Sequence, residues 1–378
     1  MFRCGVLLVF AACGLALAAA NPQAAKVAEA GKDAWTVFRG DGPQTGVSAS
    51  KLPAKLAVLW TFKTEDSIEG AVAVRGGVVY VGSMDEHLYA IDLVTGTEKW
   101  KYKAGPIKAP VSVRDGSVYV GDADGTFHRV DAAKGEKVWT HKTDGEITSG
   151  ANFAGDSVLF GSGDENLYRL STKDGKELWK FKVAGGPVMG TPALVGGRTF
   201  AAGCDSMLHV IDLETGKDTR NVELQGQVGA AAAVGGDRLF VGTMTNQVQA
   251  IDWKKGEVLW TFEPEKRSQP FYASVALTDN MVIAGSRDKR VHALDRAKGT
   301  ETWSYLTDGK VDSSPVVADG RVYFGSADNR LYVLDAAKGT LLQKIDLGDS
   351  IVASPAISGG RLVIGTQKGV VYCLGAKK

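Results

Sequence analysis

The chain has 378 residues, with 44 Lys+Arg against 43 Asp+Glu. Because there is no basic excess to neutralise phosphates, the composition argues against nucleic-acid binding. Hydrophobic residues make up 44% of the chain, which is enough for a large core and excludes disorder over most of its length.

The N-terminus has the pattern of a signal peptide at residues 1–20. Arg3 supplies a positive charge, Gly5–Ala20 is an uncharged and mostly apolar run, and its last three alanines, before Asn21, fit a cleavage site. This run has 16 residues, fewer than the about 20 that a membrane-spanning helix needs, so we expect no membrane span. A second interpretation stays open, because the run into Cys13 resembles a lipidation motif and would make Cys13 a lipid anchor. Both interpretations place the protein outside the cytoplasm, in the periplasm or at the envelope.

A strand pattern of the form Val-Tyr-Val-Gly-Ser recurs along the rest of the chain, and each copy ends in glycine. These glycines are Gly82, Gly121, Gly161, Gly203, Gly242, Gly285, Gly325 and Gly365. They follow one another at 39 to 43 residues, with about four strand patterns in each interval. This period and strand content are typical of a β-propeller.

Counting the strand patterns gives the number of blades. Inner strands and third strands each occur eight times, whereas the outer strands that follow them occur seven times, around Trp100, Trp139, Trp179, Arg220, Trp260, Trp303 and Gln343. The eighth outer strand is Val58–Lys63, at the other end of the chain, and it would complete the C-terminal blade and remove a free edge. We therefore predict an all-β fold, an eight-bladed β-propeller of four-stranded blades, over residues 58–378. Residues 21–57 form an N-terminal lead-in segment.

Six of the eight tryptophans occupy the same outer-strand position, counting Trp60 of the N-terminal strand with the five above. An aromatic residue that recurs once per blade indicates packing between neighbouring blades rather than a ligand site.

The repeat units resemble the pyrroloquinoline-quinone-like, or quinoprotein, repeat family, as in Val118–Gly121 with the turn Lys134-Gly135 and Trp139. The resemblance covers Leu56 to Gly375, and Trp35–Gly40 is similar to the segment that precedes many such propellers. For the dehydrogenases of this family it implies a quinone cofactor and Ca²⁺ in the central channel. Those enzymes have long insertions and a disulfide between adjacent cysteines, and this sequence has neither. The BamB-type scaffold branch, which is non-catalytic and of comparable length, matches better, although its partner-docking loops are missing here.

Several motifs point to the fold rather than to chemistry. Asp122–Gly125 is similar to the start of a calcium loop, but Ala133 stands where that loop needs glutamate. His128, His209 and His292 fall at equivalent third-strand positions and therefore do not predict a metal cluster. We predict no catalytic residue, no bound metal and no cofactor.

One face of the predicted propeller carries the candidate binding residues. Aligning the blades places one residue of each at the channel mouth: Glu69, Lys108, Thr148, Met189, Gly229, Tyr272, Asp312 and Val352. Acidic residues gather on this face over the first three blades, among them Asp85, Glu86 and Asp122, whereas the sixth blade is basic. Aromatic residues and arginine are enriched at interface hot spots, so we predict a binding face at Glu69, Lys108, Lys266, Arg267, Phe271, Tyr272, Arg287 and Asp312.

The predicted function is that of a monomeric protein–protein scaffold at the cell envelope. Two alternatives remain open at this point. One is a propeller that binds a small molecule or a glycan, and the other is a quinoprotein oxidoreductase.

Overall fold

The computed structural model describes Met1, residues 34–265 and residues 269–377. The predicted signal peptide and Cys13 lie outside the described residues, as do Lys266 and Arg267. The described residues from 34 onward form one compact unit. Within the described residues all regular elements are β-strands, and no helix there is long and apolar enough to cross a membrane.

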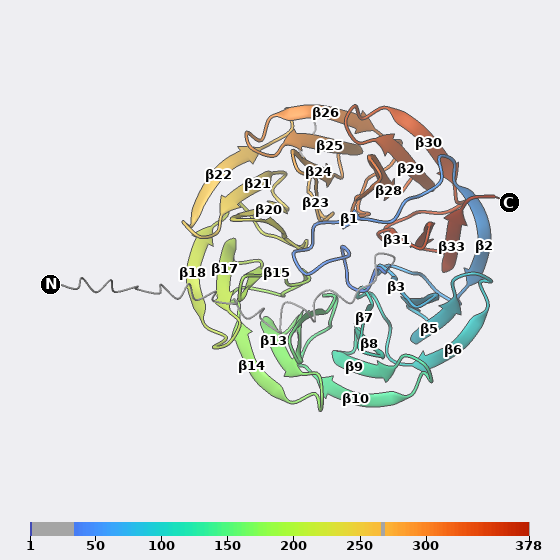
Figure 1. The fold of residues 1–378 in the computed structure, drawn as a ribbon, viewed down its shortest axis with the longest axis horizontal. Helices are drawn as coiled ribbons and strands as arrows, with labels where there is room; N and C mark the ends of the chain where they lie inside the picture. Colours follow the sequence, from blue (N-terminus) through green and yellow to red (C-terminus); the bar gives the residue numbers. More distant parts are fainter. Residues whose placement is uncertain (2–33, 266–268, 378) are drawn as a thin grey trace. The chain divides into compact units, whose positions relative to one another are not determined.

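The strands form eight blades around a central channel, as Figure 1 shows, which confirms the predicted eight-bladed propeller. The first blade contains β3 (Ala73–Arg75), β4 (Val78–Gly82), β5 (His87–Asp92) and β6 (Glu98–Lys103), ordered from the channel outward. The second contains β7 (Ser112–Arg114), β8 (Ser117–Gly121), β9 (Thr126–Asp131) and β10 (Lys137–Lys142). The third contains β11 (Asn152–Ala154), β12 (Ser157–Gly161), β13 (Asn166–Ser171) and β14 (Glu177–Lys182). The fourth contains β15 (Leu194–Val195), β16 (Arg198–Ala202), β17 (Met207–Asp212) and β18 (Asp218–Glu223).

The remaining blades repeat this antiparallel order. The fifth contains β19 (Ala233–Gly235), β20 (Arg238–Gly242), β21 (Val248–Asp252) and β22 (Glu257–Phe262). The sixth contains β23 (Ala276–Leu277), β24 (Met281–Gly285), β25 (Arg290–Asp295) and β26 (Glu301–Leu306). The seventh contains β27 (Val316–Ala318), β28 (Arg321–Gly325), β29 (Arg330–Asp335) and β30 (Leu341–Asp346). The eighth contains β31 (Ala356–Ser358), β32 (Arg361–Gly365) and β33 (Val370–Gly375), together with a strand from the N-terminal side.

That strand is β2 (Ala57–Lys63), which pairs antiparallel with β33 from Ala57↔Gly375 to Lys63↔Val370. The predicted closure is therefore confirmed. Because β2 covers the outer edge of β33, the first and last parts of the propeller are held together by a strand pairing whose register shifts once, between Val58 and Trp60.

In seven of the eight blades, the second strand ends in a glycine that makes room for the connection to the neighbouring blade. A Cβ atom on Gly82 would lie 2.2 Å from Cγ2 of Ile107, and one on Gly121 would lie 2.1 Å from Cγ2 of Ile147. Both isoleucines are fully buried. The period seen in the sequence thus records a repeated close contact, in which an apolar side chain from the next connection packs onto a bare backbone.

The repeated tryptophans link each blade to the next, which confirms the packing prediction. The Trp100 indole N–H donates to the carbonyl of Ala132 at 3.1 Å, and the Trp139 indole N–H donates to Thr172 at 3.0 Å. In the fourth blade, where no tryptophan is present, Arg220 donates to Lys255 at 2.7 Å. Each of these side chains therefore satisfies a turn carbonyl of the following blade while it covers the turn glycine.

From residue 34 onward, the lead-in segment crosses the inside of the ring and bonds to the inner strand of every blade. Near the start of this described part, Trp35 exchanges two backbone hydrogen bonds with Val74 of the first blade, at 2.9 and 2.8 Å. Near its end β1 (Val47–Ser48) pairs in parallel with β27, and Figure 1 shows β1 near the centre of the ring. The bonds to the other blades involve Val113, Asn152, Leu194, Val234, Leu277 and Ile357.

Arg39 fixes this segment in place. Its side chain is 1% exposed and Nη2 donates to the carbonyl of Val275 at 3.1 Å and to the carbonyl of Pro315. Burial lowers the pKa of Arg39 to about 9, so the guanidinium still carries its charge at neutral pH. The described part of the lead-in thus packs into the propeller through the buried side chains of Trp35, Val37 and Arg39, and it closes the channel.

Candidate functional site

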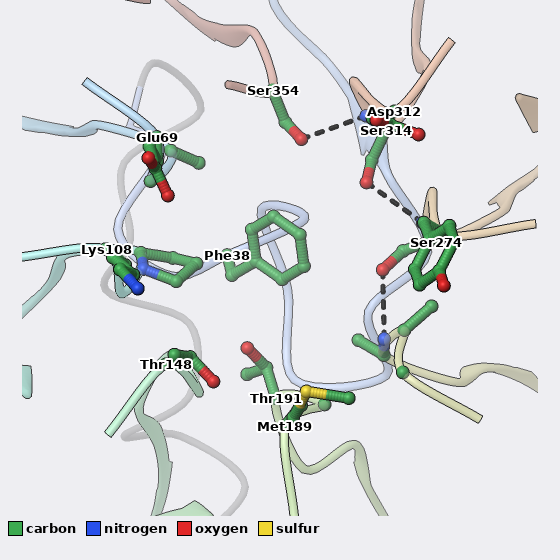
Figure 2. A pocket seen from close by; sticks show the side chains of 18 of the residues that line it. Phe38, Glu69, Lys108, Thr148, Met189, Thr191, Ser274, Asp312, Ser314 and Ser354 are labelled. Carbon is green, nitrogen blue, oxygen red and sulfur yellow. Dashed lines mark hydrogen bonds between the residues drawn. The ribbon is translucent and has the colours of Figure 1, made fainter. Parts of the chain in front are cut away.

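A pocket opens at the channel mouth. The eight aligned positions at this mouth, from Glu69 to Val352, are called the rim below, and all of them line the pocket. Each rim residue directly follows a buried apolar residue of the same connection, as Lys108 follows Ile107, which fixes where it points. The cavity has a volume of about 170 Å³. Figure 2 shows Glu69, Lys108, Thr148, Met189 and Asp312 arranged around it.

Phe38 of the lead-in forms the floor of the pocket. The rim residues come just before the inner strands. The blade residues that bond to the lead-in come about five residues later in the chain, as Val74 follows Glu69. In Figure 2 the Phe38 ring lies in the middle of the labelled side chains. The channel is therefore a cup that is open at the rim and closed by the lead-in.

Between rim and floor runs a belt of four hydroxyl groups. The Ser354 oxygen accepts the backbone N–H of Ser314 at 3.0 Å, the Ser314 oxygen accepts that of Ser274 at 2.9 Å, and the Ser274 oxygen accepts that of Ala231 at 3.0 Å. Thr191 accepts the N–H of Gly150 at 2.9 Å in the same way. Each hydroxyl satisfies an inner-strand donor of the preceding blade.

The charged side chains of the rim are mostly paired. Lys108 lies 3.7 Å from Glu146. Asp312 accepts two hydrogen bonds from Arg287, at 2.9 and 3.0 Å, and the guanidinium carbon of Arg287 lies 4.0 Å from the centroid of the Tyr272 ring. The hydrogen bond to Asp312 raises the pKa of Arg287. The Glu69 carboxylate forms no ion pair within the described part of the chain.

The structure brings five of the eight predicted site residues together at the rim: Glu69, Lys108, Tyr272, Arg287 and Asp312. Lys266 and Arg267 fall outside the described residues. The prediction for Phe271 is wrong. This side chain is 0% exposed, packs 5.7 Å from the His292 ring and covers Gly242, so it is the sixth-blade counterpart of Ile107.

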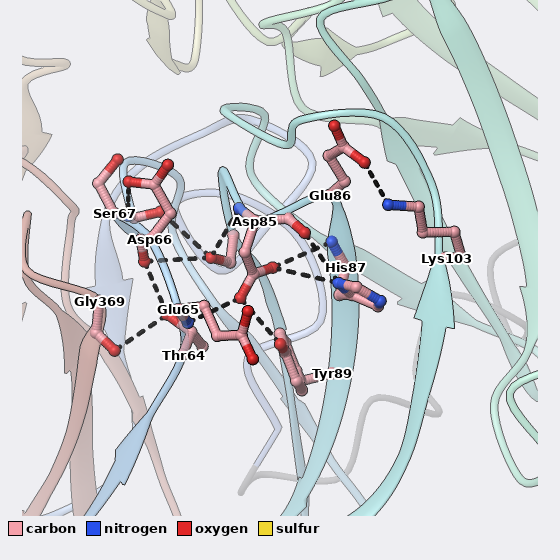
Figure 3. A network of polar contacts seen from close by, with 11 residues as sticks. Thr64, Glu65, Asp66, Ser67, Asp85, Glu86, His87, Tyr89, Lys103 and Gly369 are labelled. Carbon is pink, nitrogen blue, oxygen red and sulfur yellow. Dashed lines mark hydrogen bonds and ion pairs between the residues drawn. The ribbon is translucent and has the colours of Figure 1, made fainter.

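The acidic patch predicted over the first three blades is also wrong in part. The Asp85 side chain is 5% exposed and Asp122 is 2% exposed, so neither offers a surface charge. Figure 3 shows why: Asp85 accepts hydrogen bonds from the backbone N–H groups of Glu65 and His87 and from the Tyr89 hydroxyl. Aspartate at this hairpin tip holds the turn together.

The equivalent tips show the role of the third-strand histidines. His128 bonds to Asp122 at 2.8 Å, His209 to Asp205 at 2.8 Å and His292 to Asp288 at 2.9 Å, as Tyr89 does to Asp85. These histidines are therefore replacements within the fold, as predicted. In the described residues no group of three or more His, Cys, Asp or Glu side chains is placed to hold a metal ion.

Sequence reasoning missed Phe38 and the hydroxyl belt. Phe38 lies in a segment without repeat partners, so no alignment of blades could place it. The belt had a visible signal, because Thr191, Ser314 and Ser354 each precede a proline at the same inner-strand position.

The lining does not fit a quinone and calcium. Ca²⁺ takes about six to eight oxygen ligands, whereas the carboxylates of the pocket are Glu69 and Asp312, and Asp312 is engaged by Arg287. A fused-ring cofactor with several carboxylates would also need more cations than Lys108, the cationic side chain among the lining residues.

Fold and repeats together define a closed propeller of the quinoprotein-like class. A family model described as "Outer membrane protein assembly factor BamB" matches residues 54–185, 128–219, 163–276, 205–311 and 265–378, and the chain belongs to this family. The curated BamB of Xanthomonas campestris pv. campestris is 27% identical over 90 residues, a match that spans 22% of each chain and thus about a fifth of that relative's length.

Solved structures share the fold. BamB from Moraxella catarrhalis superposes with a TM-score of 0.73 at 19% identity, over 85% of this chain and 98% of that one. A quinohemoprotein alcohol dehydrogenase from Comamonas testosteroni gives a TM-score of 0.81 at 15% identity, over 94% of this chain and 83% of that one. At these identities the likeness is one of fold, and chemistry has to be argued from the residues of the site.

Proposed function

We propose that this protein is a non-catalytic scaffold that binds a protein partner at the cell envelope, in the assembly of outer-membrane proteins. The observation that carries the proposal is the family match, which extends through all eight blades. The mismatch between the pocket lining and a quinone–calcium pair supports the same conclusion, because the solved structures of this fold include a quinohemoprotein alcohol dehydrogenase.

The proposed docking surface is the rim between the sixth and eighth blades and its continuation to the first and second: Glu69, Lys108, Tyr272, Arg287 and Asp312. Tyr272 and Arg287 are residue types that dominate binding energies at interfaces. The two hydrogen bonds that Arg287 donates to Asp312 and the contact of its guanidinium with the Tyr272 ring hold Arg287 in one orientation. A side chain that is already ordered loses less entropy when a partner binds.

The proposal includes export and a monomeric state. Residues 1–20 would direct the chain out of the cytoplasm, with Asn21 as the first residue of a soluble form or Cys13 as the anchor of a lipidated one. Mass spectrometry of the mature N-terminus distinguishes the two forms, and an unprocessed Met1 in the envelope fraction would contradict export.

A photo-crosslinking amino acid at Tyr272 tests the partner and the surface together. Irradiation of cells should link this position to a component of the outer-membrane protein assembly machinery. The same amino acid at Lys134, an exposed turn residue away from the rim, serves as the control and should give no such product. Crosslinks to that machinery from Lys134 but not from Tyr272 would contradict the proposed surface, and none from either position would contradict the scaffold function.

A further inference from the structure

The cup at the channel mouth has features that docking of a protein on the rim leaves unused. It has a closed floor, because the lead-in bonds to the inner strand of every blade. A ligand must therefore enter and leave by the rim. The cavity volume of about 170 Å³ is well above the about 10–15 Å³ that a single water molecule needs, so the cup has room for a small ring with its substituents.

The hydroxyl belt gives the wall its chemistry. Thr191, Ser274, Ser314 and Ser354 are each at most 7% exposed, and each oxygen already accepts a backbone N–H. Within the described residues none of these hydroxyls donates a hydrogen bond. Every one retains a proton and a lone pair for a ligand, so the wall suits groups that both accept and donate hydrogen bonds.

The charges around the cup favour a neutral ligand. Lys108 and Asp312 already have partners of opposite charge, and the free carboxylate of Glu69 opposes an anion. A cation is opposed from below, since the guanidinium carbon of the buried Arg39 lies 5.9 Å from the centroid of the Phe38 ring. A carboxylate without an ion pair still accepts hydrogen bonds from neutral hydroxyl groups, and such charge-assisted bonds are strong.

The floor of the cup adds an apolar surface to its polar wall. Phe38 offers an aromatic ring in the middle of the polar wall, as Figure 2 shows. A ligand that satisfies floor, wall and rim has an apolar ring face and hydroxyl groups around its edge. We propose that the cup binds a single neutral sugar residue, stacked on Phe38, with its hydroxyl groups bonded to Glu69 and to the Ser/Thr belt.

Titration calorimetry of the purified full chain with neutral hexoses and N-acetylhexosamines tests the proposal. We expect saturable one-to-one binding of at least one of them. Affinity should fall at least fivefold in Glu69→Ala and in Phe38→Leu, which keeps an apolar side chain under the rim. Glu65→Ala is the matched control, because this exposed glutamate lies on the same connection outside the pocket, and it should bind like the parent.

The panel of ligands distinguishes a free monosaccharide from the end of a glycan, and a neutral sugar from a charged ligand. A methyl glycoside that binds as well as the free sugar would identify the end of a glycan, and binding of the free sugar alone would identify a monosaccharide. Tighter binding of arginine amide or glucuronate than of every neutral sugar would overturn the proposal. So would the absence of saturable sugar binding, or an affinity that is unchanged in both Glu69→Ala and Phe38→Leu. A sugar that binds this way leaves the protein-partner test unaffected, so the two proposals can fail separately.

Discussion

Phe271 and Tyr272 are adjacent in the chain, yet the structure gives them opposite surroundings. Phe271 is 0% exposed between Gly242 and His292, whereas Tyr272 lies at the rim under Arg287. Truncating a fully buried phenylalanine to alanine costs about 3–5 kcal/mol. Truncating Tyr272 removes one exposed cation–π contact, worth about 0.5–1 kcal/mol. We therefore expect Phe271→Ala to destabilise the propeller several times more than Tyr272→Ala does.

Thermal unfolding and partner crosslinking measure the two effects. Each kcal/mol shifts the Tm of domains of 150–250 residues by about 2–4 °C and that of a larger domain by less, so Phe271→Ala should lower the Tm by on the order of 5–10 °C. Tyr272→Ala should leave the Tm within about 2 °C while it abolishes capture of the partner. Phe271→Leu, which fills most of the space, is the control and should lie between Phe271→Ala and the parent. Loss of capture in Phe271→Ala with an unchanged Tm would show that Phe271 faces the partner and refute the assignment.

Three further predictions follow from the same structure. Deleting Val58–Lys63 should lower the Tm and cause self-association in light scattering, because β33 then has a free edge; a stable monomer would contradict closure by β2. Burial alone would lower the pKa of His292, but its hydrogen bonds to Asp288 and Glu301 raise it overall. The protonated histidine therefore stabilises the fold fully below about pH 6.5, and this contribution is lost as the pH rises through the raised pKa. His292→Gln, the residue type that the fifth blade has there, should thus cost more stability in chemical denaturation at pH 5.5 than at pH 8.5; an equal cost would exclude a charged histidine. Pyrroloquinoline quinone with Ca²⁺ should leave the Tm unchanged, since a cofactor at a hundred times its Kd would add about 2.7 kcal/mol.

The features that repeat could be predicted from the sequence, and the reason is physical. Gly82 and its equivalents are needed wherever an apolar side chain meets the backbone of the next blade, and Trp100 and its equivalents wherever a turn carbonyl needs a donor. A contact that is repeated in most blades leaves the same residue at a fixed period. Closure by β2 was predictable for the same reason, because a count of outer strands that falls short by one has to be completed elsewhere.

Features that occur once could not be found in this way. Phe271 lies where the other blades have aliphatic residues, so by residue type alone it looked like an interface aromatic, and only its contact with Gly242 shows that it belongs to the core. Asp85 looked like a surface charge because its bonds to Tyr89 and to the backbone close a turn whose geometry no residue type records.

The path of the lead-in could not be predicted from the sequence, although this segment forms the floor of the pocket. Its hydrogen bonds to the blades are made mainly by backbone groups, which every residue type has, so its path through the channel leaves almost no signal in the side chains. Arg39 and Phe38 are the exceptions, one fixing the segment to two blades and the other forming the floor of the cup. A propeller with an open channel would offer a passage, whereas this segment converts the channel into a closed pocket. The ligand chemistry of the cup therefore depends on Phe38, which lies outside the repeat, as well as on Glu69 and the hydroxyl belt of the blades.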